Sequence, residues 1–367
     1  MKTVIHIVGA RPNFIKAAPL VQEMNKLNIH NLLVHTGQHY DYNMSDKFFE
    51  ELDIKPDHFL HAGSDITSIM KECEILFNKV QPDLVIVYGD VNSTVAATFI
   101  AKKMQIQVAH IESGLRSYDR TMPEELNRIV TDSISDYLFV TCWDGIANLK
   151  KEGIEGPQKC FMVGNTMIDT LVKLESIFDQ SNILNEHKLT NKDYVLVTMH
   201  RPSNVDDKQS LNRLVDAIHE ISCMYDIVWP LHPRTALKLK LFGINIRPVI
   251  KCIPPAGYID FMCLQKNAKL IITDSGGVQE ESSYFNVPCL TIRDNTERPV
   301  TITEGTNKLI GTTYDNIISE IEKLNFNTSS SIKYWDGKSS IRISNILRKA
   351  FNLKTLQNEK INTITNK

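Results

Sequence analysis

The chain lacks three features that mark specialised classes of protein: paired cysteines, an excess of one charge and a long apolar run. Its seven Cys are scattered with no Cys-x-x-Cys pair, which indicates neither a disulfide framework nor a zinc knuckle and favours a reducing compartment. The 41 Lys and Arg nearly balance the 43 Asp and Glu, giving a formal net charge of −2. This balance argues against a dominant electrostatic attraction to nucleic acid or anionic lipid.

No apolar stretch approaches the roughly 20 residues that span a bilayer. The N-terminal run MKTVIHIVG has the form of a buried strand rather than of a signal peptide, whose apolar region is longer and ends in small residues. We therefore expect a cytoplasmic protein that binds neither membrane nor nucleic acid.

What the chain does have is an alternation of short apolar runs with helix-length amphipathic segments, and this alternation restarts after about residue 170. The expected strands are Val4–Val8, Leu32–Thr36, Leu84–Tyr88, Val108–Ile111, Tyr137–Val140, Phe161–Val163, Tyr194–Thr198, Ile227–Pro230, Pro248–Ile253, Leu270–Thr273 and Cys289–Ile292. Continuous rather than alternating apolar strands are typical of parallel sheets covered on both faces. The sequence therefore predicts an α/β protein with two doubly wound, Rossmann-like domains whose ligand edges face one cleft.

We place the N-terminal domain at residues 1–168 and the C-terminal domain at residues 169–349, with a tail at about 350–367 that packs back on the first domain. The polar, weakly patterned stretch from Asp179 to Lys192 is expected to be a surface loop.

The first strand is followed by Gly9-Ala10-Arg11-Pro12-Asn13 and then by a helix that contains Lys16. A helix N-terminus with two added cations suits a phosphate group. The alternative is a surface loop with two solvated cations. The loop matches neither the dinucleotide-binding nor the P-loop pattern.

Three acids, Asp90, Glu112 and Glu124, occur after consecutive strands of the first domain. Two of them have an ordinary explanation: Asp90 as a helix cap, and Glu124 as a dipole partner that could pair with Arg128 four residues on. Glu112 is harder to explain in this way, because an unpaired carboxylate at the end of an apolar strand is costly to bury. If the fold brings them together, they suit general acid/base chemistry, with a Mg²⁺ or Mn²⁺ site as the second interpretation. Mutual repulsion would then raise their pKa values.

The second domain has its own polar residues after strands. His200-Arg201 favours anion contact or proton transfer, with a hydrogen-bonded loop His as the alternative, and His232 follows a further strand. Ser275-Gly276-Gly277 opens a helix whose backbone N–H groups suit a phosphate, and Glu281 lies one turn later, where it suits ribose hydroxyls. This combination indicates a sugar nucleotide.

Ten segments in family order resemble the non-hydrolysing UDP-N-acetylglucosamine 2-epimerases. They are GARPNFIKAAP, TGQHYDYNM, VYGDVNSTVAA, AHIESGLRS, MPEELNRIVTD, VGNTMIDTL, TMHRPSNVDD, LHPRT, LIITDSGGVQEES and RDNTERPVT, spread over about residues 4–310.

The resemblance implies the glycosyltransferase-B architecture, a homodimer, and reversible conversion of UDP-GlcNAc to UDP-ManNAc without metal or other cofactor, supplying a surface polysaccharide pathway. UDP would be eliminated to leave 2-acetamidoglucal and then re-added. The implied catalytic residues are Asp90, Glu112, Glu124 and His200. The implied substrate- and UDP-binding residues are Arg11, Lys16, His232, Ser275, Gly276, Gly277, Glu281 and Arg298.

Several departures from the family pattern bear on specificity. Tyr40-Asp41-Tyr42-Asn43 follows Gln38 and His39, the candidate residues of an allosteric site for a second UDP-GlcNAc. The run His200-Arg201-Pro202-Ser203-Asn204 resembles the branch that epimerises UDP-2,3-diacetamido-glucuronic acid, which is the alternative substrate. A glycosyltransferase of the same fold, a hydrolysing epimerase and a non-catalytic sugar-nucleotide sensor are the other function classes.

Overall fold

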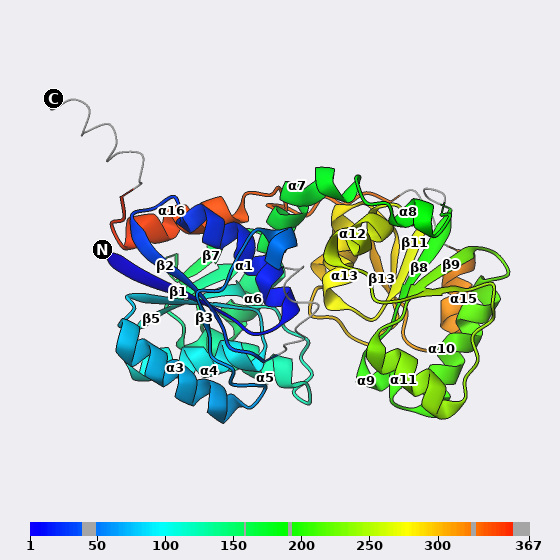
Figure 1. The fold of residues 1–367 in the computed structure, drawn as a ribbon, viewed down its shortest axis with the longest axis horizontal. Coiled ribbons are helices and arrows are strands. Elements are labelled where there is room, and N and C mark those ends of the chain that lie inside the picture. The colour runs from blue at the N-terminus through cyan, green and yellow to red at the C-terminus, as the bar shows by residue number, and fades with distance from the viewer. Residues whose placement is uncertain (39–48, 158, 190–192, 324–327, 355–367) are drawn as a thin grey trace. The chain divides into compact units, whose positions relative to one another are not determined.

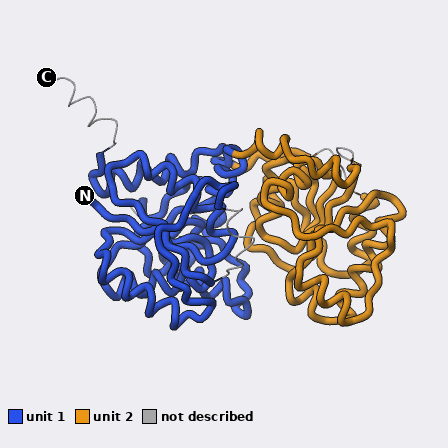
Figure 2. The backbone as a smooth tube through the Cα atoms, in the orientation of Figure 1, with its two compact units in different colours: residues 1–173, 333–367 blue, residues 174–332 orange. Residues whose placement is uncertain are grey.

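The computed structural model describes residues 1–38, 49–157, 159–189, 193–323 and 328–354. The chain divides into two compact units (Figure 2). Unit 1 comprises residues 1–173 together with the chain from residue 333 onward, and unit 2 comprises residues 174–332. No helix in the described ranges has the length and apolar character needed to cross a membrane.

Unit 1 is built on a seven-stranded sheet in the order β3-β2-β1-β4-β5-β6-β7 (Figure 1). The strands are β1 (Lys2–Val8), β2 (Ile29–His35), β3 (His58–Phe59), β4 (Leu84–Tyr88), β5 (Gln107–Ser113), β6 (Tyr137–Val140) and β7 (Cys160–Met162). Every pair of neighbours is parallel. The strand order reverses between β1 and β4, and ligands of such sheets bind at the carboxyl ends of strands beside this reversal.

The helices of unit 1 lie on both faces of this sheet (Figure 1). They are α1 (Arg11–Met24), α3 (Ile66–Val80), α4 (Asn92–Lys103), α5 (Pro123–Ile134), α6 (Trp143–Lys151), the first part of α7 (Thr166–Phe178) and α16 (Ser339–Ala350). On one face, Ile5, Val85 and Val108 of the strands pack with Leu76 of α3 and Ile100 of α4 in one buried cluster.

Unit 2 repeats the design with a six-stranded parallel sheet in the order β10-β9-β8-β11-β12-β13. Its strands are β8 (Tyr194–Thr198), β9 (Asp226–Pro230), β10 (Lys251–Ile253), β11 (Leu270–Thr273), β12 (Cys289–Thr291) and β13 (Asn307–Leu309). Its helices are α8 (Ile183–Glu186), α9 (Pro202–Val205), α10 (Lys208–Ile221), α11 (Pro233–Phe242), α12 (Tyr258–Lys266), α13 (Gly276–Tyr284), α14 (Val300–Thr303) and α15 (Tyr314–Glu322).

Alternate residues of β8 serve the two faces of the unit 2 sheet. Val195 and Val197 join the cluster that includes α10 and α15, whereas Tyr194 and Leu196 join the cluster that includes α12 and α13. Burial on both faces explains why these strands read as continuous apolar runs in the sequence.

The expected domain boundaries need correction. The first boundary falls between residues 173 and 174, inside α7, rather than after residue 168. Residues 333–349, assigned above to the C-terminal domain, belong to unit 1. Asp169 accepts hydrogen bonds from the backbone N–H groups of Ser339 (3.0 Å) and Ser340 (2.6 Å), and α16 packs against α1. An amphipathic pattern predicts a helix but does not say which sheet the helix covers.

The tail expected to pack on the first domain is described only to residue 354, and there the backbone carbonyl of Lys354 accepts a hydrogen bond from Asn28 N–H. The stretch from Asp179 to Lys192, expected to be a surface loop, also contains the short helix α8. Ile183 of this helix is buried in the unit 2 core and anchors it there. Residues 190–192 of that stretch lie outside the described residues.

Candidate functional site

In unit 1, the loops after β1 and β4 meet where the strand order reverses. Asn13, in the first turn of α1, ties the two loops together: its side-chain oxygen accepts from Gly9 and Ala10 N–H, and its amide donates to the carbonyl of Tyr88. Gly89 follows β4 with a φ of +63°, and a Cβ there would lie 3.4 Å from Nζ of Lys16. The backbone thus turns close against the side chains of α1.

Glu112 has the most unusual backbone of the candidate residues. Its φ is +70°, in the left-handed region that residues other than Gly and Asn rarely occupy. The pairing of β5 with β6 shifts register between Ile111 and Ser113, so Glu112 sits at an irregularity in the strand. Such irregularities re-aim a side chain, and strained backbone of this kind clusters at functional sites.

The redirected carboxylate of Glu112 is buried between two cations. Lys16 forms an ion pair with its Oε2, and an Nη of Arg128 lies 3.1 Å from its Oε1. All three side chains are less than 10% exposed, which leaves little water to screen the charges. Two cations favour the ionised form of this carboxylate.

Arg128 joins Glu112 to Asp90, because the same guanidinium nitrogen lies 2.6 Å from Oδ2 of Asp90. Asn127 donates to the backbone carbonyl of Asp90 at 2.9 Å and fixes the loop that carries it. The structure therefore brings Lys16, Asp90 and Glu112 together through Arg128, which we call the acid–cation cluster. Cations separate its two acids, so the mutual repulsion expected above is offset.

Glu124 differs from the other two acids. It lies exposed in the first turn of α5, and among the described residues no hydrogen bond or ion pair joins it to Asp90, Glu112 or Arg128. The expected i,i+4 pair between Glu124 and Arg128 is not formed. The buried neighbour Glu125 instead accepts from the backbone N–H of Ser117 (2.7 Å) and of Tyr118 (3.1 Å), bracing the loop before α5.

A buried network supports the cluster from behind. His110 bonds Oδ1 of Asp132 through Nδ1 (2.7 Å) and the carbonyl of Gly89 through Nε2 (2.7 Å). Burial opposes ionisation of Asp132, but His110 and Arg116 outweigh it and hold the pKa of Asp132 below its usual range. His110 is therefore a packed, hydrogen-bonded residue that fixes the turn next to Asp90.

Two further candidates of unit 1 are placed by the structure. Arg11 is exposed at the start of α1. Gln38 accepts hydrogen bonds from the backbone N–H (3.0 Å) and hydroxyl (2.7 Å) of Ser93, at the start of α4. His39 lies outside the described residues.

In unit 2, the loops after β8 and β11 meet at the equivalent reversal of strand order. His200 follows β8 and Asp274 follows β11. The carboxylate of Asp274 is fully buried and accepts from the backbone N–H groups of His200 and Arg201. Nδ1 of His200 lies 3.0 Å from Oδ1 of Asp274, and the ring of His232 lies 5.3 Å from that of His200.

Arg298 lies over the N-terminus of α13. A Cβ built on Gly276 would be 2.6 Å from Nη1 of Arg298, so any other residue there would make the guanidinium shift from this position. Glu280 and Glu297 contact Arg298 at 3.1 Å each. Ser275 is the N-cap residue of α13, and Gly276 and Gly277 form its first turn. Cation and free backbone N–H groups at one helix N-terminus make an anion-binding arrangement.

Glu297, which was not among the expected site residues, lies at the centre of three arginines, of which Arg293 and Arg298 are buried and Arg201 is partly exposed. Arg293 lies 3.0 Å and Arg201 3.6 Å from its Oε1, and Arg298 lies 3.1 Å from its Oε2. Burial opposes ionisation of Glu297, yet the arginines dominate and hold its pKa far below the usual carboxyl range. Three cations around one such carboxylate favour binding of a further anion.

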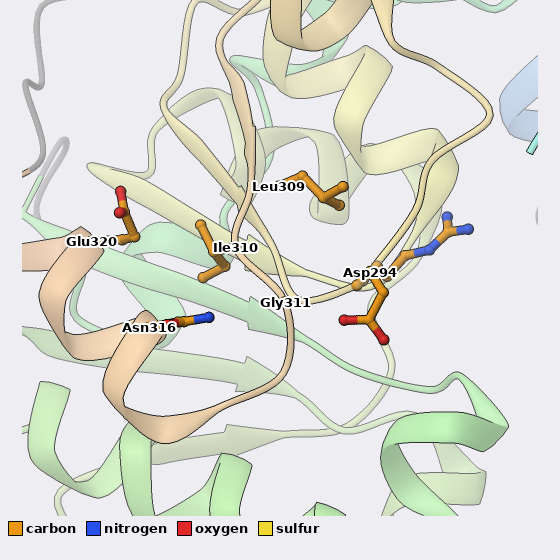
Figure 3. Close-up of a pocket in the computed structure, with 7 residues that line it drawn as sticks. Asp294, Leu309, Ile310, Gly311, Asn316 and Glu320 are labelled. Carbon is orange, nitrogen blue, oxygen red and sulfur yellow. The ribbon is translucent and has the colours of Figure 1, made fainter.

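Glu281 is buried, and one of its oxygens accepts from the amide of Gln265 at 2.5 Å. A separate cavity of about 370 Å³ opens beside β13 (Figure 3). It is lined by Arg293, Asp294, Leu309, Ile310, Gly311, Asn316 and Glu320, none of them a predicted site residue. Within the described ranges, no group of three or more His, Cys, Asp or Glu side chains is arranged to hold a metal ion.

Known proteins resemble this chain along nearly its whole length. A model of the family described as UDP-N-acetylglucosamine 2-epimerase matches residues 22–348. The UDP-N-acetylglucosamine 2-epimerase of Methanocaldococcus jannaschii is 43% identical over 357 residues, which are 93% of this chain and 97% of the relative. The UDP-2,3-diacetamido-2,3-dideoxy-D-glucuronate 2-epimerase of Pseudomonas aeruginosa is 39% identical, over 94% of this chain and 99% of the relative.

The crystal structure of the M. jannaschii UDP-GlcNAc 2-epimerase in complex with UDP-GlcNAc and UDP matches with a TM-score of 0.87 and 41% identity, covering 95% of this chain and 100% of that chain. These matches confirm the α/β class with two parallel sheets and a glycosyltransferase-B-like architecture, and they define the protein as an isomerase. The chain belongs to the UDP-N-acetylglucosamine 2-epimerase family, as its motifs predicted.

Proposed function

We propose that this protein interconverts UDP-GlcNAc and UDP-ManNAc by inverting C2, without releasing the sugar from UDP as a final product. The observation that carries the proposal is the acid–cation cluster, in which Asp90 and Glu112 are held by Arg128 and Lys16 where the strand order of unit 1 reverses. Sugar transfer needs no proton chemistry at C2, so this cluster favours an epimerase over a glycosyltransferase or a sensor.

In the proposed reaction, a base of unit 1 takes the C2 proton, and that electron pair forms the C1–C2 double bond of 2-acetamidoglucal. The C1–O bond breaks toward the β-phosphate, which leaves as UDP. Re-addition then places a proton on the opposite face of C2 and re-forms the C1–O bond. Inversion requires acid/base groups for both faces, and we assign this role to Asp90, Glu112 and Glu124, without an order among them.

A carboxyl group acts as a base only when it is ionised, and the two cations beside Glu112 favour its ionised form. Because one of them is Lys16, the ion pair must loosen, or the lysine must turn to the phosphate, when the substrate is bound. Preorganised cations at the site of developing charge are an effective means of stabilising a transition state.

Unit 2 is assigned to UDP. Its binding groups would be Arg298 and the first turn of α13 for the diphosphate, Glu281 for the ribose, and His200 with His232 near the departing β-phosphate. Arg11 of unit 1 would add a further cation. Departure of UDP leaves extra negative charge on the β-phosphate, which these groups would stabilise.

UDP-2,3-diacetamido-glucuronic acid is the second candidate substrate. The 39% identity to the P. aeruginosa enzyme, over 94% of this chain, supports this sugar as an alternative substrate. The 43% identity to the M. jannaschii enzyme and the Thr296-Glu297-Arg298-Pro299 run favour UDP-GlcNAc.

We further propose a homodimer that works without metal in a reducing compartment, the cytoplasm, and supplies ManNAc units for a surface polysaccharide. Exposed apolar side chains on three adjacent helices of unit 1, Ile75 of α3, Phe99 of α4 and Leu126 of α5, support self-association. All seven cysteines are free thiols, in keeping with a reducing compartment.

Incubation with UDP-GlcNAc in deuterated water tests the function. We expect deuterium at C2 of both sugars and accumulation of intact UDP-ManNAc, followed by NMR and mass spectrometry. Hydrolysis to free ManNAc, or sugar transfer without exchange at C2, would reject the proposal. A parallel incubation with UDP-2,3-diacetamido-glucuronic acid decides between the two substrates by their kcat/KM values.

Glu112→Gln and Glu124→Gln test the assignment of the acids. Both variants should still bind UDP but lose at least about 100-fold in exchange at C2, the scale of general acid/base catalysis. The exposed Glu155→Gln serves as the control and should exchange normally. Near-normal exchange in both test variants would show that the acid assignment is wrong.

A further inference from the structure

Asp274 makes more hydrogen bonds than a helix cap or loop residue requires. Its fully buried carboxylate accepts from the backbone N–H of His200 (2.9 Å), the backbone N–H of Arg201 (2.8 Å) and the side-chain amide of Asn204 (3.1 Å). Burial opposes ionisation of Asp274, but its bond with His200 and these N–H donors hold its pKa below the usual range. A carboxylate fixed in this way is an ionised acceptor of defined orientation.

The ring of His200 rests on this acceptor. Its Nδ1 lies 3.0 Å from Oδ1 of Asp274, and an ionised carboxylate accepts only from a protonated nitrogen. Nδ1 of His200 therefore keeps its hydrogen in both the neutral and the charged ring, and Nε2 is the atom that gains and loses a proton. The side chain is 41% exposed, which leaves part of the ring open to a ligand.

The neighbouring ring of His232 has the opposite arrangement. Its Nδ1 accepts from the backbone N–H of Arg234 (3.2 Å), which caps α11. This bond requires a bare Nδ1, so a neutral His232 carries its hydrogen on Nε2. Partial desolvation and the nearby His200 lower the pKa of His232.

The charged groups around the two rings explain which one takes the proton. Asp274 faces His200, whereas Arg201 and Arg234 are the flanking cations. Arg201 lies against Glu297, and Arg234 is paired with Asp206. Among the described residues, the acidic group in direct contact with the ring of His200 is therefore Asp274.

We propose that Asp274 is the positioning residue of this site: it holds His200 as the Nδ1–H form and makes His200, rather than His232, the ring that carries a proton to the departing phosphate. This inference rests on the proposed function, in which UDP leaves and returns at C1. As UDP departs, Nε2–H of the charged ring donates a hydrogen bond to the β-phosphate oxygen, or transfers its proton there, and the neutral ring recovers that proton when UDP re-adds.

NMR of the protein labelled with ¹⁵N and ¹³C in histidine tests the inference without turnover. His200→Gln and His232→Gln identify the two sets of signals. We expect the neutral wild-type ring of His200 to carry hydrogen on Nδ1 and that of His232 on Nε2. The reverse tautomers would overturn the proposal.

Asp274→Asn and Asp274→Glu separate positioning from folding. Asp274→Asn should let the neutral ring of His200 populate the Nε2–H form, because a side-chain amide can donate to a bare Nδ1. Asp274→Glu should keep the Nδ1–H form. Asn204→Ala, which removes a different partner of Asp274, is the matched control and should also keep that form, and the tautomer of the distant His219 should stay unchanged in all variants. An unchanged tautomer in Asp274→Asn, or an equal change in Asn204→Ala, would refute the role.

Kinetics complete the test. Asp274→Asn should reduce kcat for exchange at C2 at least tenfold with a smaller change in KM, and Asp274→Glu should recover part of that loss. If the wild-type rings have the expected tautomers but the protein catalyses no exchange, the proposed function fails while the positioning of His200 stands. If exchange occurs and the His200 tautomer does not respond to Asp274, the positioning role alone fails.

Discussion

The contact between Arg128 and Glu112 can be tested by measuring how much it contributes to the free energy of unfolding of unit 1. Arg128→Met keeps the length of the aliphatic stem and removes the charge. Because Arg128 is fully buried against Glu112 and Asp90, we expect unit 1 to lose about 3 kcal/mol, the lower end of the range for a broken buried ion pair, since Lys16 still neutralises Glu112.

A double-mutant cycle isolates that contact. Glu112→Gln combined with Arg128→Met should cost less than the sum of the single changes by about 1–3 kcal/mol, as expected for residues in contact. Native-state hydrogen exchange of the β4 and β5 amides reports the free energy of unfolding for unit 1 specifically. Glu124→Gln, which removes an acid at helical spacing from Arg128 but without an ion pair to it, is the matched control and should be additive.

If the effects of Arg128→Met and Glu112→Gln on the free energy of unfolding add within about 0.5 kcal/mol, the reasoning is refuted, because two buried charges in contact should be energetically coupled. An equal coupling energy for the pairs Arg128–Glu124 and Arg128–Glu112 would also contradict the reasoning. That result would mean that the pair expected from helical spacing does form.

Three further predictions follow from single contacts. Gly276→Ala places a Cβ against Arg298 and should weaken UDP binding about 10- to 100-fold, the loss of one charge-assisted hydrogen bond; calorimetry that finds an unchanged Kd would contradict this. Burial lowers the pKa of His6 to about 4, so the unfolded chain binds a proton first and stability should fall between about pH 6.5 and pH 4. His6→Gln should flatten that dependence of Tm, whereas the exposed His30→Gln should retain it. Asp169→Asn should speed hydrogen exchange in α16 by removing its N-terminal acceptor, and unaltered protection would show that packing alone holds the helix.

The sequence predicts the sheets well because burial on both faces leaves a purely apolar signature in each strand. β4, β6, β8 and β11 have the expected bounds. Two of the four edge strands, β3 and β13, were not predicted, because β3 has only two residues and β13 begins with the polar residues Asn307 and Lys308 and so lacks an apolar run. The register shift that redirects Glu112 has no pattern of its own in the sequence.

The partners of charged residues were harder to predict. Arg128 was expected to pair along its own helix with Glu124, but the structure gives it Asp90 and Glu112 from two other loops. Asp274 looks in the sequence like any acid at the end of a strand, and only the positions of His200 and Asn204 reveal its role. The spacing of residues along the chain predicts neighbours on one helix, whereas these contacts depend on the order of the strands in the sheet.

The return of α16 to unit 1 has a consequence for synthesis of the chain. Unit 2 is one continuous stretch and has all its strands before residue 333 leaves the ribosome, whereas α1 stays without its neighbour until Ile343 and Leu347 emerge. Domains generally fold as units in the order in which they are made. Here the unit whose sheet appears first is the last to gain all its helices, so a chain that stalls late leaves the α16-facing side of α1 open to chaperones.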